Sequence, residues 1–248
     1  MRADDLDHAI ELQNASDYGL TGGIHSLDGR EVEHWLDHVE VGNAYVNRHI
    51  TGAIVQRQPF GGWKRSSVGG GAKAGGPGYV AQFARLCERD DVGVDTRVLT
   101  ATRRSVWQRH SSIDHDETGL TAEANVLRYI PLQRVEVRHG PDADRALDIL
   151  RVTATVTGVP LGESNAAEES DVDFARRVAS APTPPGRVRL LTDLGDDARR
   201  ILHAADIAID TSVPVAAPLI ELQRWVREQA ISQTLHRHGR LVDHPPFA

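Results

Sequence analysis

Hydrophobic residues in the first third of the chain recur with the spacing of helices and short strands. A helix is predicted over residues 29–39, because its apolar positions follow the spacing i, i+3, i+4 and i+7. These positions are Val32, Trp35, Leu36 and Val39. A shorter helix is predicted from Asp5 to Asn14, with Asp4 as its N-cap. Short strands are expected within residues 18–26 and 43–47, so residues 1–90 are interpreted as mixed α/β.

Strands and helices alternate from Val126 to the end of the chain. The predicted strands are residues 135–138, 188–191 and 207–210, and the predicted helices are residues 142–156, 171–179, 198–205 and 219–226. This alternation implies a parallel, doubly wound sheet in residues 126–248. Residues 91–125 are charged and weakly periodic, so they are interpreted as an extended connector, in which residues 92–98 have the pattern of a strand.

The composition excludes several classes of protein. The chain has 248 residues, 40% hydrophobic and 25% charged, with a net charge of −7 and one cysteine. A mildly acidic chain gains no general attraction to nucleic acid. No apolar run approaches the roughly 20 residues of a membrane helix, and the N-terminus lacks the apolar core of a signal peptide. A single cysteine excludes an internal disulfide framework, so we expect a soluble cytoplasmic protein.

The most informative segment is residues 51–64, with the sequence T-G-A-I-V-Q-R-Q-P-F-G-G-W-K. Its small residues Gly52 and Ala53 allow backbone N–H groups to approach an anionic ligand closely. Phe60, in the following Pro-Phe-Gly-Gly turn, can hold an aromatic ring beside that ligand. The segment therefore predicts a site for a small anion with an apolar portion.

Three motifs occur in an order shared with aldehyde dehydrogenases. Residues 17–23 read D-Y-G-L-T-G-G, residues 41–47 read V-G-N-A-Y-V-N, and residues 59–66 read P-F-G-G-W-K-R-S. They match the family patterns x-Y/F-G-L-T-x-G, x-G-N-x-x-V/I-N and P-F-G-G-x-K-x-S. Residues 1–87 therefore resemble the C-terminal end of an aldehyde dehydrogenase catalytic chain. The resemblance implies an α/β fold of that type for this segment.

The sequence T-G-A-I-V-x-R-Q before the turn is typical of the L-glutamate γ-semialdehyde (pyrroline-5-carboxylate) dehydrogenase branch. The resemblance implies that the amides of Gly52 and Ala53 hold the substrate α-carboxylate and that Phe60 packs on its aliphatic chain. It also implies NAD as the cofactor and proline catabolism as the pathway. The run G-A-K-A-G-G-P at residues 71–77 is similar to the same branch and to bifunctional proline utilisation A proteins.

The rest of the chain also resembles proline utilisation A proteins. Residues 118–129 contain G-x-x-x-E-x-N-x-L-R, a segment that follows the dehydrogenase module in the long members. The α/β region after it, Rossmann-like with a parallel sheet, resembles their C-terminal extension, which has an aldehyde-dehydrogenase-like fold without catalysis. Residues 228–239 resemble the last segment of that extension. The expected organisation is a dehydrogenase segment at 1–90, a connector at 91–125 and an α/β extension at 126–248.

The catalytic motifs of the family are missing from the sequence. There is no G-Q-x-C nucleophile turn, no general-base glutamate motif and no E-x-F-G-P motif. We therefore expect a C-terminal portion of a longer dehydrogenase, with no catalytic residue of its own, acting with an upstream dehydrogenase chain or as a homo-oligomer. Two alternatives stay open: a non-catalytic module that packs on a partner dehydrogenase, and a degraded reading frame. Without the missing layers, the apolar side of the 29–39 helix is expected to be exposed and to cause association.

Other candidate residues receive structural interpretations. Cys87 lies in a helix-like context without an elbow turn, so it is expected to be structural. The run 69–78 matches no phosphate-binding motif and is interpreted as a flexible loop. Lys64 is expected to form a structural pair. The remaining candidates are His236, His238 and His244, which lack metal-site spacing, and Glu168-Glu169 and Asp196-Asp197, which are expected to cap helices.

Overall fold

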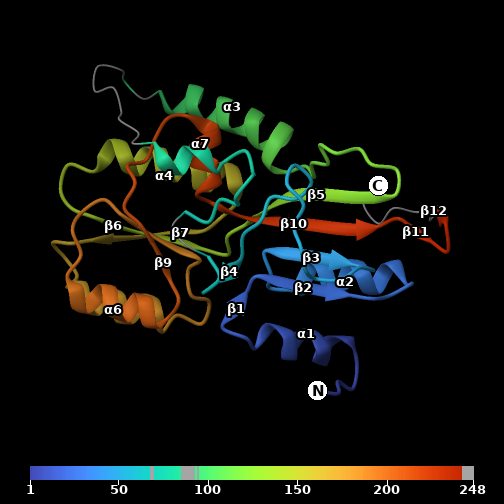
Figure 1. Cartoon of the computed structure of the whole chain (residues 1–248). Coiled ribbons are helices and arrows are strands. Elements are labelled where there is room, and N and C mark those ends of the chain that lie inside the picture. Colours follow the sequence, from blue (N-terminus) through green and yellow to red (C-terminus); the bar gives the residue numbers. More distant parts are fainter. Residues whose placement is uncertain (68–69, 85–92, 94, 242–248) are drawn as a thin grey trace. The chain divides into compact units, whose positions relative to one another are not determined.

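The computed structural model describes the chain except for residues 68–69, 85–92, 94 and 242–248 (Figure 1). It divides into two compact units. Unit 1 contains the described residues of Met1–Tyr79, of Ile113–Tyr129 and of the segment from Glu228 onwards. Unit 2 contains those of Val80–Ser112 and Ile130–Arg227. Among the described residues, no helix has both the length and the apolar character needed to cross a membrane.

Unit 1 is built on a sheet with two helices. Its elements are α1 (Leu6–Asn14), β1 (Tyr18–Gly19), β2 (Thr21–Ile24), α2 (Gly29–His38), β3 (Asn43–Val46), β4 (Trp63–Lys64), β5 (Glu123–Pro131), β10 (Val226–Thr234), β11 (His236–Arg237) and β12 (Arg240–Leu241). The main sheet has the order β2-β3-β10-β5. Strand β3 is parallel to both β2 and β10. The core packs α1 and α2 against this sheet through Ile10, Trp35, Val46 and Ile231.

Unit 2 is a doubly wound α/β structure. Its elements are the 3₁₀ helix η1 (Val80–Phe83), α3 (Thr96–Val106), the π-helix η2 (Trp107–Ser111), β6 (Val135–His139), α4 (Asp144–Thr157), β7 (Leu161–Asn165), α5 (Asp171–Ala179), β8 (Arg187–Leu190), α6 (Asp196–Ala204), β9 (Ala208–Asp210) and α7 (Pro218–Gln223). The sheet order is β7-β6-β8-β9, and all three pairings are parallel. This confirms the parallel, Rossmann-like sheet predicted from the alternating pattern.

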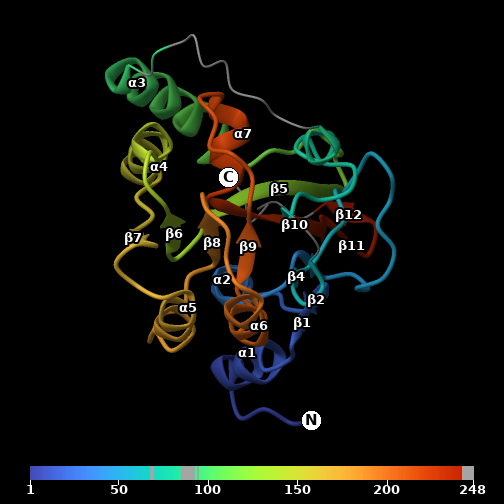
Figure 2. The same ribbon diagram turned by 90° about the vertical axis from the view of Figure 1, so that its left-hand side faces the viewer.

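Helices cover both faces of the sheet in unit 2 (Figure 2). Helices α5 and α6 pack on one face around Phe174, Val188 and Leu202. Helix α4 packs on the other face, where Val137, Leu150 and Trp225 are buried together. Strand β8 contributes Val188 and Leu190 to the first core, and strand β6 contributes Val135 and Val137 to the second. In each strand these residues are two positions apart and so point to the same face of the sheet.

The structure corrects three local expectations. Residues 96–106 form helix α3 instead of a strand in an extended connector; Asp95 caps it, and its buried face contains Arg103 beside Leu99. Residues 226–234 form strand β10, so Val226 does not continue the preceding helix. Helix α1 is capped by Asp5, whose carboxylate accepts from the His8 N–H, and not by Asp4. The division of the chain into modules at residues 90 and 125 stays a prediction.

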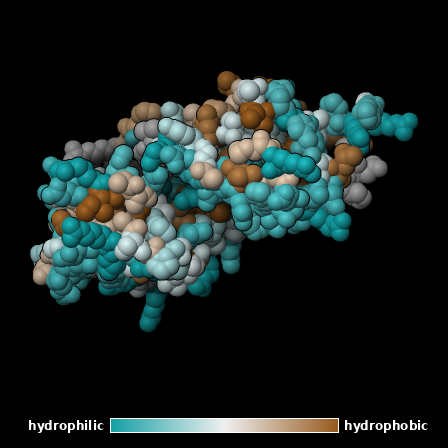
Figure 3. All heavy atoms as spheres, turned by 90° about the horizontal axis from the view of Figure 1, so that it is seen from below, coloured by the Kyte–Doolittle hydropathy of each residue, from teal (hydrophilic) through white to brown (hydrophobic). Residues whose placement is uncertain are grey.

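The apolar side of α2 is buried, contrary to expectation. Val32, Trp35, Leu36 and Val39 are each no more than 3% exposed, within the core of unit 1. The chain itself covers this face with α1 and the main sheet, so these four side chains offer no surface for association. In the view of Figure 3 the surface is mostly hydrophilic, with separate hydrophobic patches.

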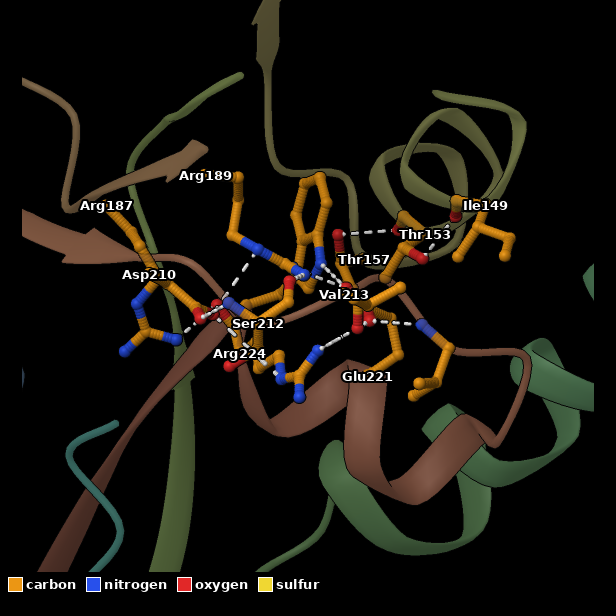
Figure 4. Close-up of polar contacts among 12 residues, drawn as sticks. Ile149, Thr153, Thr157, Arg187, Arg189, Asp210, Ser212, Val213, Glu221 and Arg224 are labelled. Carbon is orange, nitrogen blue, oxygen red and sulfur yellow. Dashed lines mark hydrogen bonds and ion pairs between the residues drawn. The ribbon is translucent and has the colours of Figure 1, made fainter. Parts of the chain in front are cut away.

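A buried ion-pair network holds the loop after β9 in unit 2 (Figure 4). Arg189 on β8 and Glu221 on α7 are both 0% exposed, and Nη1 lies 2.5 Å from Oε1. Glu221 also accepts from the Val215 N–H at 3.0 Å and from the Trp225 indole at 3.2 Å. The Arg189 guanidinium donates to the Ser212 carbonyl and pairs with Asp210. The charged groups are thus hydrogen-bonded where they are removed from water.

We predict that Glu221→Gln lowers the free energy of unfolding by about 3–5 kcal/mol, because it leaves the buried Arg189 charge without its closest partner. Glu163→Gln is the matched control, because it removes a carboxylate from an ion pair with Arg151 in the same unit. In that pair the Arg151 side chain is 51% exposed and the Glu163 side chain is 31% exposed. It should cost no more than about 1 kcal/mol. Urea unfolding followed by the Trp225 indole resonance measures both values. Equal losses would contradict the importance of burial.

Candidate functional site

The predicted anion-binding residues lie in the loop between β3 and β4 of unit 1. Gly52 is exposed and Ala53 is half-buried. Gly52 has φ = +84°, and a Cβ added there would meet no atom within 4 Å. Glycine is therefore favoured by the left-handed backbone and not by lack of space. Within the described part of the chain, the N–H groups of Gly52 and Ala53 have no hydrogen-bond partner.

The backbone of Phe60 is fixed by a bridge to the glycine-rich run. Its N–H donates to the Ala74 carbonyl at 2.9 Å, and its carbonyl accepts from the Ala74 N–H at 3.0 Å. The Phe60 side chain is half-buried. No hydrogen bond between the described residues joins Phe60 directly to Gly52 or Ala53, so their joint action in one site stays a prediction.

Asn43, the first residue of β3, holds the turn on both sides of Phe60. Its side-chain amide donates to the Pro59 carbonyl at 3.1 Å, and its Oδ1 accepts from the Gly61 N–H at 3.1 Å. Gly42 makes this approach feasible, because a Cβ there would lie 2.1 Å from the Gly61 oxygen. The Gly-Asn pair of the second motif therefore holds the Pro-Phe-Gly-Gly turn in place.

A buried lysine lies behind the turn. Lys73 is 1% exposed, and its ammonium donates to the Gly61 carbonyl and lies 3.4 Å from Asn43 Oδ1. Its backbone N–H donates to Glu228 Oε2 on β10 at 2.7 Å. Burial lowers the pKa of Lys73 to about 7, although the nearby Glu228 charge acts in the opposite direction. Burial likewise raises the pKa of Glu228, against the effects of the Lys73 N–H and ammonium.

The structure places the other candidates as follows. Lys64 is a structural residue, as expected: its ammonium contacts the Asn14 carbonyl at 2.5 Å and pairs with Glu40. The described part of the glycine-rich run is not simply a flexible loop, because Lys73 is buried and Ala74 is paired. Cys87 and His244 lie outside the described residues. Among those described, no group of three or more His, Cys, Asp or Glu could hold a metal ion.

Two predicted helix caps have different roles. Asp196 and Asp197 lie in the first turn of α6, where carboxylates interact favourably with the helix dipole. Glu169 instead forms an ion pair with Arg177 at 2.8 Å, while Ser170 caps α5. Hydrogen bonding by Arg177 lowers the pKa of Glu169 to about 2.

Sequence reasoning missed the support of the loop. Asn43, Lys73 and Glu228 lie inside segments that carry the family resemblance, but their roles depend on contacts between distant parts of the chain. The Lys73 N–H and Glu228 are 155 positions apart. A signal was present, since each residue belongs to a recognisable motif, yet a motif does not reveal which partner its side chain meets.

We predict that Lys73→Met removes a specific pH dependence of stability. The unfolded lysine has a pKa of 10.5 and the folded one about 7, so between these values the unfolded state binds more protons. Wild-type stability should gain from this group as pH rises from 7 to 10, by up to about 1.4 kcal/mol per pH unit. Urea unfolding of both proteins at several pH values tests this, and parallel pH profiles would contradict it.

Sequence comparison supports the resemblance for the N-terminal third. A model of the "Aldehyde dehydrogenase family" matches residues 1–86. The chain is 48% identical over 80 residues to 1-pyrroline-5-carboxylate dehydrogenase 1 of Halalkalibacterium halodurans, covering 32% of this chain and 15% of that protein. It is 46% identical over 82 residues to the bifunctional protein PutA of Rhizobium meliloti, covering 33% of this chain and 6% of that protein.

Structural comparison extends over nearly the whole chain. The structure of Proline Utilization A (PutA) from Corynebacterium freiburgense matches with a TM-score of 0.76 and 40% identity. The match covers 97% of this chain and 25% of that protein. The chain thus spans about a quarter of this neighbour and about a seventh of the dehydrogenase from H. halodurans.

The motif geometry and the comparisons lead to one assignment. The Gly42–Asn43 pair, the turn it seats and the match of the family model all concern the same stretch of sequence. Residues 1–86 are therefore the segment that carries the likeness to the aldehyde dehydrogenase family.

Proposed function

We propose that this chain is the substrate-anchoring part of an NAD-dependent dehydrogenase that oxidises L-glutamate γ-semialdehyde to L-glutamate in proline catabolism. The observation that supports this most directly is the pair of unpaired N–H groups at Gly52 and Ala53 in the exposed loop. The relatives named 1-pyrroline-5-carboxylate dehydrogenase support the substrate class.

The loop has the chemistry that an α-carboxylate requires. A carboxylate is stabilised by several N–H donors, and charge-assisted hydrogen bonds are stronger than neutral ones. Gly52 has no side chain to obstruct the approach, and its backbone carries no competing internal hydrogen bond. The half-buried ring of Phe60 is suited to the aliphatic part of the same substrate. Gly52, Ala53 and Phe60 are therefore the proposed substrate-binding residues.

The described residues of unit 2 do not fit NAD. In a dinucleotide-binding fold, the pyrophosphate lies at a helix N-terminus that follows a glycine-rich turn. Here the first turns of α4 and α6 carry Asp144, Asp196 and Asp197. The Gly195 N–H at the start of α6 already donates to Asp171 at 2.8 Å. The negative charges of these carboxylates would repel the pyrophosphate of NAD. We therefore propose that NAD is bound elsewhere.

The catalytic cysteine, the general base and the NAD-binding residues would come from another part of a longer dehydrogenase or from a partner chain in the cytoplasm. In this arrangement residues 1–90 contribute to the substrate site, residues 91–125 connect, and residues 126–248 form a non-catalytic α/β extension. The alternative is a module that only packs on a partner dehydrogenase. The substrate-anchoring function requires a ligand to bind at Gly52, whereas the packing module does not.

We predict that the chain binds L-glutamate, the reaction product, with a Kd on the order of millimolar. The amide resonances of Gly52 and Ala53 should shift during titration in ¹H–¹⁵N spectra, because their N–H groups receive the α-carboxylate. 4-Aminobutyrate, which lacks the α-carboxylate, is the control ligand and should shift them much less. No saturable shift at these residues would contradict the substrate role and favour the packing module.

We predict that Gly52→Ala weakens L-glutamate binding about tenfold, because a left-handed backbone costs an alanine about 1–2 kcal/mol and the loop relaxes away from it. Gly158→Ala is the matched control: φ is +74°, and its Cβ would also meet nothing within 4 Å. Both variants should lose stability, but only Gly52→Ala should lose affinity. If Gly52→Ala and Gly158→Ala bind L-glutamate with equal affinity, Gly52 is not part of the substrate site.

We predict that the chain alone produces no NADH from glutamate semialdehyde and NAD, since the sequence has no family nucleophile turn. An absorbance assay at 340 nm measures this. Activity of the chain alone would contradict the absence of a nucleophile and direct attention to Cys87.

A further inference from the structure

A single carboxylate joins the two ends of the loop that contains Gly52 and Ala53. Glu123, the first residue of β5, accepts from Arg48 at 2.8 Å through Oε1. Its other oxygen, Oε2, accepts from Arg57 at 3.1 Å. Arg48 precedes Gly52 and Arg57 follows Ala53, so Glu123 closes the loop. Its side chain is 18% exposed, which limits screening by water.

A second contact fixes the end of the loop next to the Pro-Phe-Gly-Gly turn. Gln58 is 6% exposed, and its side-chain amide donates to Asn125 Oδ1 at 2.9 Å and to Ser232 Oγ at 2.6 Å. Asn125 is itself held in place, because its backbone N–H donates to Asp116 at 2.9 Å and its side chain to Thr118 at 3.3 Å. The loop end is therefore hydrogen-bonded to two neighbouring strands, β5 and β10.

The portion between these contacts has little support of its own. Its backbone hydrogen bonds are those from the Arg57 and Gln58 N–H groups to the Ile54 carbonyl, at 3.0 and 3.2 Å. Ile54 and Val55 are exposed, at 43% and 88%. The position of the Gly52–Ala53 peptide thus depends on where the loop ends are held, because a short loop with fixed ends has few accessible conformations.

We infer that Glu123 and Asn125 are positioning residues, which hold Arg48, Arg57 and Gln58 so that the N–H groups of Gly52 and Ala53 are preorganised for a carboxylate. This gives the E-x-N part of the 118–129 motif a role in the substrate site, although it is about 70 residues from that site in the sequence. The inference rests on the proposed function for its ligand, but not for its effect on the loop.

The test compares Glu123→Gln and Asn125→Ala with the wild-type chain. Glutamine keeps the size of Glu123 and removes its charge, and alanine removes one of the two acceptors of the Gln58 amide. Glu163→Gln is the control, because it breaks a carboxylate–guanidinium pair with similar contacts of 2.7 and 2.8 Å to Arg151, in unit 2. Glu123→Asp, which keeps the carboxylate, tests for partial rescue.

Two quantities are measured for each protein. ¹⁵N relaxation without ligand gives the backbone order parameters of Gly52 and Ala53, and titration with L-glutamate gives Kd. We expect Glu123→Gln and Asn125→Ala to reduce the order parameters from about 0.85 to below about 0.6 and to weaken binding about tenfold. Glu163→Gln should change neither, and Glu123→Asp should recover part of both.

The outcomes separate the two proposals. If the wild-type chain binds L-glutamate and the two variants bind it equally well with an ordered loop, the positioning role is wrong and the proposed function stands. If the wild-type chain does not bind L-glutamate, the proposed function fails and the order parameters decide alone. A loop that stays ordered in Glu123→Gln and Asn125→Ala then overturns the inference, whereas a loop that loses order supports it.

Discussion

The close approach of two backbone segments at Gly42 determines the geometry of the candidate site. A side chain at this position would overlap the Gly61 oxygen at 2.1 Å and crowd Gly62 Cα and Lys73 Nζ at 2.8 Å. Because none is present, Asn43 can bind the turn before and after Phe60, and Lys73 can reach the Gly61 carbonyl. The seating of the turn on Asn43 and the contact of Lys73 with Gly61 therefore depend on the absence of a side chain at Gly42.

Buried charge is handled differently in the two units. In unit 2, Arg189 and Glu221 meet directly, and further donors saturate the carboxylate. In unit 1, Glu228 accepts from the backbone of Lys73, while the Lys73 ammonium is directed to the Gly61 carbonyl. The first arrangement strengthens a loop within an α/β scaffold. The second places a lysine with a pKa near 7 directly behind the candidate site.

Local patterns predicted the elements whose partners are apolar. Helix α2 was evident from its four periodic residues, and the strands β6 and β8 were evident from alternation with helices. Helix α3 was missed because its buried face contains Arg103, whose guanidinium reaches the Ile149 and Val215 carbonyls. Strand β10 was missed because its buried positions include Gln229 and Ser232. Polar residues such as these are buried only through distant partners, which no local pattern shows.

The assignment of the site residues rests on the family resemblance and stays a prediction. The family resemblance indicated Gly52, Ala53 and Phe60, and the structure shows a left-handed glycine and two unpaired amides at that place. The support by Glu123 and Asn125 could not be predicted, since Arg57 and Gln58 are 66 and 67 positions away from them.

The position of β10 in the main sheet also affects how the chain is made. Strand β10 pairs with β3, yet the ribosome adds Val226 about 180 residues after Val46. Synthesis proceeds at about 5–20 residues per second, so the edge of β3 stays without its partner strand β10 for roughly 10–40 s. During that time every residue of unit 2 has been synthesised, while the sheet of unit 1 still has an open edge. The main sheet of unit 1 is therefore completed after unit 2 has been synthesised, although strands β2 and β3 are translated before unit 2.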